Sequence, residues 1–399
     1  MTSAADHESP AGLERAASLA LLAFAASLQV SIGAASVLLT ITAVLWIALV
    51  IRNRERIEVP GMFWPLAVYA AVTMISAAFA RYPLDSLRDT KQLVLFAIVP
   101  MAYRLLAGRR SLTAVDVIIT VGALEAVYGI VQYAILDYDD LQRRVQGSLT
   151  HYMTYSGVLM LAACTAAARI MFRRQDRTWA SLVMPALLVA IALTMSRNAW
   201  VGICVGLGVL LLLRDFRLVA LLPVAAALFL AVAPAQLSQR LYSTFSLKDP
   251  SNRDRVAMMK SGMRIIRDYP LTGVGPDGIR HVYADYRDPS AVRPLNPHLH
   301  NVPIQIAAER GLPALGVWIW FIAVLIRDLL RKNRSSALRS LPTGALAAVM
   351  AMLAAGMFEY NFGDSEFLML FLLIVTLPYA GDRLPARTAP SSVAQRHAA

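Results

Sequence analysis

The stretch AASVLLTITAVLWIALVIRNRER, residues 34–56, decides the class of fold. Residues 34–51 are almost wholly apolar, and a membrane-spanning helix needs about 20 such residues. Three arginines follow at once, Arg52, Arg54 and Arg56. An apolar run that ends in arginines is typical of a membrane helix whose end faces the cytoplasm. The sequence therefore predicts a membrane protein.

The composition of the whole chain agrees with this stretch. Of its 399 residues, 57% are hydrophobic and 16% are charged, with a formal net charge of +12. A soluble protein is about 45–50% apolar and about 25% charged. An ordinary cytosolic enzyme, a disordered protein and a disulfide scaffold are excluded. In a membrane protein the positive charge predicts cytoplasmic arginines, or a site for anionic lipid or phosphate, and not a nucleic-acid partner.

Apolar runs of similar length recur along the chain. We predict an all-α polytopic membrane protein with about 12 transmembrane helices, the first two joined in a tight hairpin around Gly33. The polar stretch 1–14 lacks the basic start and cleavage site of a secretory signal, so we expect the first span to be retained. The predicted spans are 16–32, 34–51, 61–80, 89–107, 112–136, 151–171, 178–195, 198–213, 218–235, 301–326, 340–359 and 363–380.

Arginine and lysine assign the two sides of the membrane. With a cytoplasmic N-terminus, the cytoplasmic loops carry the arginine clusters at 104–110, 173–177 and 327–334, whereas the short loops on the other side carry few. This asymmetry predicts cytoplasmic N- and C-termini. Residues 381–399 are rich in Pro, Ala, Arg and Ser, which predicts a disordered cytoplasmic tail.

One long loop divides the chain. We predict nine spans in 1–235, a periplasmic loop in 236–299 and three spans in 300–380. The loop carries ten basic residues and many apolar ones, and a loop this long in a compact protein is functional or disordered. Its apolar content favours a folded, functional segment.

Within this loop, residues 251–269 are predicted to form a helix that begins at Ser251 and ends before Pro270. Its predicted apolar stripe is Val256, Met259, Met263 and Ile266, and its predicted basic face is Arg253, Lys260, Arg264 and Arg267. Such a helix fits the membrane interface, or contact with the phosphates of a lipid-linked substrate. Arg255 stands beside the apolar stripe, so we expect it to be partly buried next to an anionic partner.

Two further features fit a site for an anion. Arg197 joins two spans with almost no loop, where a cation is costly unless it snorkels or has a partner such as a diphosphate. His298 and His300 stand at the entrance to the next span, and a histidine can accept a proton near neutral pH. Further zinc ligands at suitable spacing are missing, so we expect no metal.

Two other features are expected to be structural. The Gly/Pro turn 270–276 is expected to serve the fold, and Glu125 is expected to pair with another group inside the bundle.

The spacing after the histidines matches a known pattern. His300 and Asn301, nine residues and then Gly311 match the motif of bacterial O-antigen ligases, although Ala314 stands where the family has Gly, Thr or Tyr. The chain thus resembles these ligases, within the wider O-antigen ligase and polymerase superfamily.

Two more superfamily patterns are similar in this chain. Arg255 and the run Pro-Leu-Thr-Gly-Val-Gly at 270–275 match one pattern, in which Met259 replaces a tryptophan. The junction Ser-Arg-Asn-Ala-Trp at 196–200 matches the other.

The resemblance implies a GT-C-like glycosyltransferase of the bacterial inner membrane, with its active site facing the periplasm. The implied donor is a polysaccharide on undecaprenyl diphosphate, and the acceptor is a sugar hydroxyl of lipid A-core in lipopolysaccharide biosynthesis. The reaction is expected to invert the anomeric carbon without metal or cofactor.

Under this resemblance His300 is the expected general base and His298 its neighbour or orienting partner. Arg197 and Arg255 are the expected diphosphate ligands, with Lys260 and Arg264 as weaker candidates. An O-antigen polymerase, a protein-directed oligosaccharyltransferase and a lipid or sugar transporter remain as alternatives.

Overall fold

The computed structural model describes residues 10–383 except 174, 233–234, 244–245 and 247. The described chain is helical and contains no strand. The helices are α1 (Pro10–Ser27), α2 (Ile32–Asn53), α3 (Phe63–Ala78), α4 (Pro83–Asp89), η1 (Thr90–Ala97), α5 (Ile98–Leu105), α6 (Arg110–Ile135), α7 (Tyr152–Phe172), α8 (Arg177–Leu193), α9 (Arg197–Arg214), η2 (Phe216–Ala220), α10 (Leu221–Val232), α11 (Ala235–Tyr242), α12 (Pro250–Asp268), α13 (Ile279–Tyr286), α14 (Val302–Ser335), α15 (Ser340–Gly356), η4 (Asn361–Gly363) and α16 (Ser365–Gly381).

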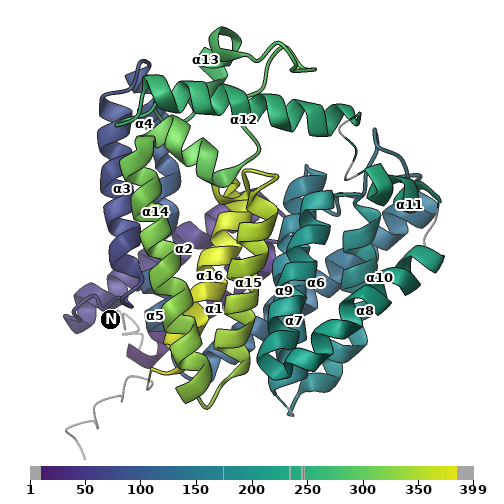
Figure 1. Ribbon diagram of the computed structural model, residues 1–399. Helices are drawn as coiled ribbons and strands as arrows, with labels where there is room; N and C mark the ends of the chain where they lie inside the picture. Colours follow the sequence, from purple (N-terminus) through teal and green to yellow (C-terminus); the bar gives the residue numbers. More distant parts are fainter. Residues whose placement is uncertain (1–9, 174, 233–234, 244–245, 247, 384–399) are drawn as a thin grey trace, which may run out of the picture.

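The long helices form a bundle, and α12 lies across one end of it (Figure 1). We call this the α12 end and the other the opposite end. Helices α7, α15 and α16 are almost wholly buried, with α15 packed against both α7 and α9. The core is therefore built from the middle and the end of the chain, and α12 covers it at one end.

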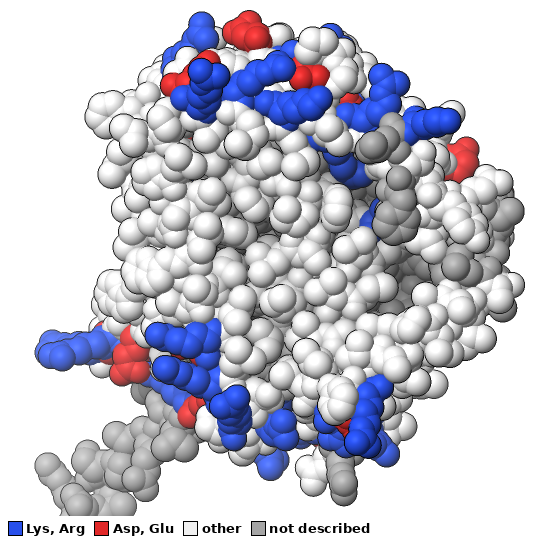
Figure 2. All heavy atoms as spheres, viewed as in Figure 1, with Lys and Arg blue, Asp and Glu red and all other residues white. Residues whose placement is uncertain are grey.

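On the face that Figure 2 draws, charged side chains gather at the two ends of the bundle. Figure 2 shows lysine, arginine and acidic side chains at both ends, separated by a broad uncharged band. Five described helices, α2, α6, α7, α9 and α14, are long and apolar enough to cross a membrane, and shorter apolar helices accompany them. These features confirm a multi-pass membrane protein. The count of 12 spans stays a prediction.

Two predicted segments differ in detail. The predicted span 89–107 consists of η1 followed directly by α5, with the short helix α4 before it. The first hairpin turns at residues 28–31, where the Ser31 side chain caps α2 by accepting a hydrogen bond from Ala34 N at 3.4 Å. Gly33 lies inside α2.

Ion pairs tie distant segments together at the opposite end. Arg104 on α5 binds Glu55 after α2 at 2.7 Å and Glu14 on α1 at 3.4 Å. Arg383 after α16 binds Glu58 at 2.7 Å. The start of α1 and the end of α16 thus lie at the same end of the bundle. The tail predicted to be disordered lies almost entirely outside the described residues.

The start of α12 differs from the prediction. The cap is Asp249, not Ser251: its side chain accepts hydrogen bonds from Ser251 N at 2.9 Å and Asn252 N at 3.3 Å. Pro250 occupies the first turn, where its missing N–H costs nothing. The helix therefore begins one residue earlier, at Pro250.

The packed face of α12 is also not the predicted stripe. Val256, Met259 and Met263 are exposed. The buried face lies beside them and combines the small residues Ala257, Ser261 and Gly262 with Met258 and Ile265. A Cβ on Gly262 would lie 2.4 Å from Ile304 Cγ2, so α12 approaches the start of α14 too closely for a larger residue.

The Gly/Pro turn after α12 is structural, as predicted, and it completes a kink in α14. Gly311 has φ 82°, and Pro313 lacks an N–H, so α14 loses internal hydrogen bonds there. The freed carbonyls of Ala308 and Glu309 accept hydrogen bonds from Val274 N at 3.0 Å and Gly275 N at 2.8 Å. The segment between His300 and Gly311 is thus one short helical piece, bounded by a cap and a kink.

Candidate active site at the α12 end

A cavity of about 930 Å³ opens at the α12 end. Its walls are α12, the first turns of α7 and α9, the segment before α14 and the connection between α15 and α16. It brings together four of the six predicted site residues. The ionisable residues that line it are Arg144, Arg197, Arg240, Arg255, Arg293, His151, His298, His300, Asp249, Asp254, Glu359, Asp364, Tyr152 and Tyr360.

His300 is paired with a carboxylate in this cavity. Its Nδ1 lies 3.0 and 2.9 Å from the two carboxylate oxygens of Glu359. Burial disfavours the charged form of Glu359, but the contact with His300 outweighs it and lowers the pKa of that carboxyl below its ordinary value. The paired Nδ1 leaves Nε2 as the ring nitrogen available to a ligand.

The backbone at His300 is unusual. Its φ of 48° places it in the left-handed region, which is uncommon for residues other than glycine. The next residue, Asn301, caps α14 by accepting a hydrogen bond from Ile304 N at 3.0 Å, and its own amide donates to Met357 O at 3.0 Å. The cap therefore holds the His300 backbone beside the segment that carries Glu359.

His298 does not orient His300. Its ring lies against Tyr360, with 5.7 Å between ring centroids, and its Nδ1 is buried without a hydrogen-bond partner among the described residues. Burial lowers the pKa of His298, and the neighbouring His300 lowers it further. His298 is therefore favoured in its neutral form. Glu359, and not the predicted His298, is the residue that orients the His300 ring.

Arg197 is fixed to the start of α12. The side chain is 5% exposed and donates to Asp249 Oδ1 at 3.3 Å and to Ser243 O at 3.1 Å. Arg240 also contacts Asp249, at 3.5 Å. Burial raises the pKa of Asp249, but Arg197 and Arg240 outweigh it and keep that pKa below its ordinary value. Arg197 therefore has a carboxylate partner within the protein rather than an exposed, snorkelling head.

Arg255 has no such partner. Its only hydrogen bond within the described chain is from Nη1 to Ser251 Oγ at 3.4 Å, and it forms no ion pair there. Burial lowers the pKa of Arg255, and the field of Glu359 partly opposes this shift. The partial burial was predicted correctly, but no anionic partner for Arg255 stands among the described residues, which leave most of the guanidinium donors unused in the cavity.

Three cavity arginines were missed by sequence reasoning, namely Arg144, Arg240 and Arg293. Arg144 lies 4.3 Å from the centre of the Tyr152 ring, and burial lowers its pKa. Arg240 is partly buried, and burial lowers its pKa to about 10. The position of Arg144 just before α7, among few basic residues on its predicted side, was the available signal.

Lys260 and Arg264 lie outside the cavity. Lys260 is exposed on α12, and Arg264 binds Asp288 at 2.9 Å on the outer side. Glu125, expected to pair inside the bundle, accepts hydrogen bonds from Ser148 N at 2.9 Å and Ser148 Oγ at 2.7 Å. Its partner is a hydroxyl and an amide, not a cation.

The arrangement combines an anion site with a proton acceptor. Arg255 faces the same cavity as the His300–Glu359 pair, with Arg144, Arg197 and Arg240 adding positive charge. Guanidinium groups bind phosphate oxygens through paired N–H donors, and a carboxylate-oriented histidine can remove a proton from a hydroxyl. Over the described residues, no group of three or more His, Cys, Asp or Glu side chains stands in a metal-binding arrangement.

One of the comparisons with known proteins finds a related family over this region. Residues 180–319 match a family model described as O-antigen ligase. The match spans α9 and α12 and reaches into α14, so it includes Arg197, Arg255 and His300. A comparison with curated proteins finds no match. This part of the chain, with the core of the candidate site, is thus similar to the O-antigen ligase family, which supports a place in the O-antigen ligase and polymerase superfamily.

Proposed function

We propose that the protein is an O-antigen ligase. It transfers a polysaccharide from undecaprenyl diphosphate to a sugar hydroxyl of lipid A-core at the periplasmic face of the bacterial inner membrane. The observation that carries the proposal is the shared cavity of Arg255 and the His300–Glu359 pair. Arg255 supplies a cation for the diphosphate of the donor, and the His300–Glu359 pair supplies a base for the acceptor hydroxyl.

Arg255 is the first candidate to bind the diphosphate. Its guanidinium is partly buried, lines the cavity and has no ion pair within the described chain. Arg197 contributes positive charge from the wall while Asp249 fixes its position. Together they stabilise the negative charge that grows on the leaving diphosphate, the role a divalent cation would otherwise have. We therefore propose that the reaction is independent of metal.

His300 acts as the general base in the proposed step. The acceptor hydroxyl attacks the anomeric carbon from the face opposite the diphosphate. The new C–O bond forms as the bond to the diphosphate oxygen breaks, which inverts the configuration. The hydroxyl proton passes to Nε2 of His300, and undecaprenyl diphosphate leaves with the bonding electron pair. Glu359 holds the ring and stabilises the imidazolium, as a carboxylate does in other histidine-based sites.

The outer face of α12 suits the membrane interface in this proposal. Its exposed Val256, Met259 and Met263 stand beside exposed Lys260 and Arg264. An apolar stripe next to cations is typical of a helix at the level of lipid headgroups. Lys260 and Arg264 then meet headgroup phosphates or guide the donor, and they do not hold its diphosphate in the cavity.

Reconstitution with purified components tests the proposed function. The protein is mixed with polymer-loaded undecaprenyl diphosphate and lipid A-core, with and without EDTA. We expect glycan on lipid A-core in both cases. Loss of the product in EDTA would refute the metal-free reaction alone.

The same assay separates the ligase from its nearest rival. An O-antigen polymerase uses the same donor and the same kind of cavity, but extends a second lipid-linked glycan. A longer lipid-linked chain with unmodified lipid A-core would therefore identify a polymerase. Absence of any transferred glycan would contradict the enzyme assignment and favour a transporter.

A further inference from the structure

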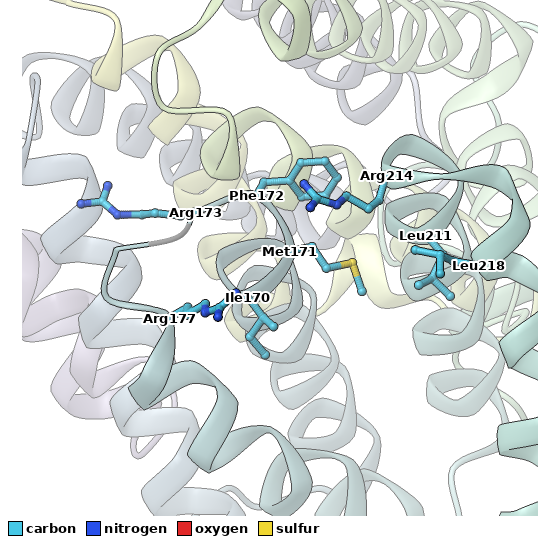
Figure 3. Close-up of a pocket in the computed structure, with 8 residues that line it drawn as sticks. All are labelled: Ile170, Met171, Phe172, Arg173, Arg177, Leu211, Arg214 and Leu218. Carbon is cyan, nitrogen blue, oxygen red and sulfur yellow. The ribbon is translucent and has the colours of Figure 1, made fainter.

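A second cavity opens at the opposite end of the bundle, far from the candidate active site. It has a volume of about 690 Å³ and lies where the end of α7, the start of α8, the end of α9 and η2 come together (Figure 3). We call it the opposite-end cleft. Its lining residues are Ile170, Met171, Phe172, Arg173, Arg177, Leu211, Arg214 and Leu218.

The cleft joins positive charge to an apolar floor. Each of its arginines comes from a different helix end, those of α7, α8 and α9 (Figure 3). Arg173 pairs with Asp176 at 3.1 Å, whereas Arg177 and Arg214 form no ion pair within the described chain. No described carboxylate lines the cleft. Two uncompensated guanidinium groups beside five apolar side chains suit a ligand with an anionic head and a hydrocarbon tail.

The surroundings indicate that this ligand comes from the membrane. Trp179, one turn or less from Arg177, and Phe216, just beyond Arg214, are exposed. Aromatic residues of this kind gather at the level of lipid headgroups. Leu182 on α8 and Leu212 on α9 are also strongly exposed, at 71% and 58%, so the helices continue from the cleft as lipid-facing surface.

We propose that the opposite-end cleft binds an anionic phospholipid. Arg177 and Arg214 contact the headgroup phosphate, and an acyl chain lies along Met171, Leu211 and Leu218. Basic pockets between membrane helices are known to hold anionic headgroups in this way. The proposal does not depend on the glycan-transfer activity, because no residue of the cleft lines the α12-end cavity.

Native mass spectrometry tests the site directly. The purified protein is released from detergent with equal amounts of dioleoyl phosphatidylglycerol and dioleoyl phosphatidylethanolamine. We expect bound phosphatidylglycerol in the wild type, and binding about 10–30-fold weaker in the double variant Arg177→Gln/Arg214→Gln. The matched control Arg52→Gln/Arg56→Gln removes exposed Arg52 in the last turn of α2 and exposed Arg56 just after that helix, and should bind phosphatidylglycerol like the wild type. Equal loss in both variants would overturn the proposal.

A second variant separates the apolar floor from the charge. Leu211→Trp fills the space for the acyl chain and keeps all three arginines, so we expect it to lose the lipid while its thermal unfolding temperature in detergent stays unchanged. Retained lipid in this variant would contradict the assigned floor.

Competition identifies the source of the phosphate. Glycerol 3-phosphate carries the headgroup chemistry without acyl chains, and we expect it not to displace the lipid at equal concentration. Displacement would indicate a site for a soluble phosphate compound and overturn the lipid assignment.

Discussion

The two arginine-lined cavities at the ends of the bundle differ in what accompanies the arginines. In the α12-end cavity, Arg255 lines the same space as the His300–Glu359 pair, in which His300 Nδ1 lies 2.9 Å from Glu359 Oε2. In the opposite-end cleft, the described lining holds arginines and apolar side chains alone. Arginine by itself binds an anion, whereas bond formation to a hydroxyl also needs a proton acceptor. The difference fits the proposed glycan transfer at the α12 end and the proposed lipid binding at the opposite end.

The cavities also differ in how firmly their arginines are held. Arg197 is 5% exposed and fixed by Asp249, which in turn caps α12. Arg177 and Arg214 are exposed. A fixed guanidinium can be aimed at a charge that develops during a reaction, because its position is set before the reaction begins. Binding of a lipid headgroup involves no such developing charge, so exposed cations at a membrane surface suffice for it.

Removal of the base should give the largest effect. His300→Ala leaves the arginines in place but removes the proton acceptor, so we expect glycan transfer to fall by about 10²–10⁴-fold. The reconstituted assay measures it. His281→Ala on α13 is the matched control, since His281 lies outside the cavity, 3.5 Å from Asp85. Full activity in His300→Ala would remove the basis for a catalytic difference between the two ends.

Loss of the orienting carboxylate should cost less. Glu359→Gln keeps the shape of the side chain but removes the charge that stabilises the imidazolium, so we expect a decrease of about 10–100-fold. The acidic limb of the pH–rate profile should move to lower pH. A purely structural role for Glu359 would lower activity without moving that limb.

Bidentate binding by Arg255 is the next test. Arg255→Lys keeps the charge but loses the paired donors, and we expect transfer to fall by about tenfold. Arg253→Lys is the matched control, because Arg253 is exposed two residues earlier on the same helix. Equal rates in the two variants would show that the cavity needs charge alone, like the opposite-end cleft.

Acid should weaken the His300–Glu359 pair. The pKa of Glu359 is lower in the folded protein than its ordinary value of 4.5. The pair therefore adds stability above that value, and this stability is lost as the pH falls through the lowered pKa. We expect the thermal unfolding temperature of the wild type to drop more steeply below pH 4.5 than that of Glu359→Gln. Parallel curves would contradict the pairing.

The sequence predicted the site best where the residues concerned lie close together along the chain. His300 precedes the cap Asn301, and Gly311 marks the kink, so the spacing of the motif is the length of one helical piece. Glu359 could not be placed on His300, because the two residues are 59 positions apart and meet only when α14 and α15 pack together.

The face of α12 was misjudged for a packing reason. Hydrophobic periodicity selected Val256, Met259 and Met263, which are exposed. The true contact includes Gly262, which carries little hydrophobic signal but allows a close approach to Ile304 on α14. In membrane proteins small residues often form helix contacts, since lipid and core are equally apolar. Hydropathy alone therefore cannot tell which apolar face meets protein and which meets lipid.

The smallest effect is expected for a conservative change in the opposite-end cleft. Arg177→Lys retains a point charge on an exposed position that has no ion pair among the described residues. A phospholipid headgroup in an open cleft needs that charge more than a fixed pair of donors, because lysine also binds phosphate. Phosphatidylglycerol binding should therefore weaken by less than about fivefold, the scale of an exposed ion pair. A loss as large as that of Arg177→Gln/Arg214→Gln in native mass spectrometry would mean that this cleft, too, demands bidentate geometry, and the contrast with Arg255 would disappear.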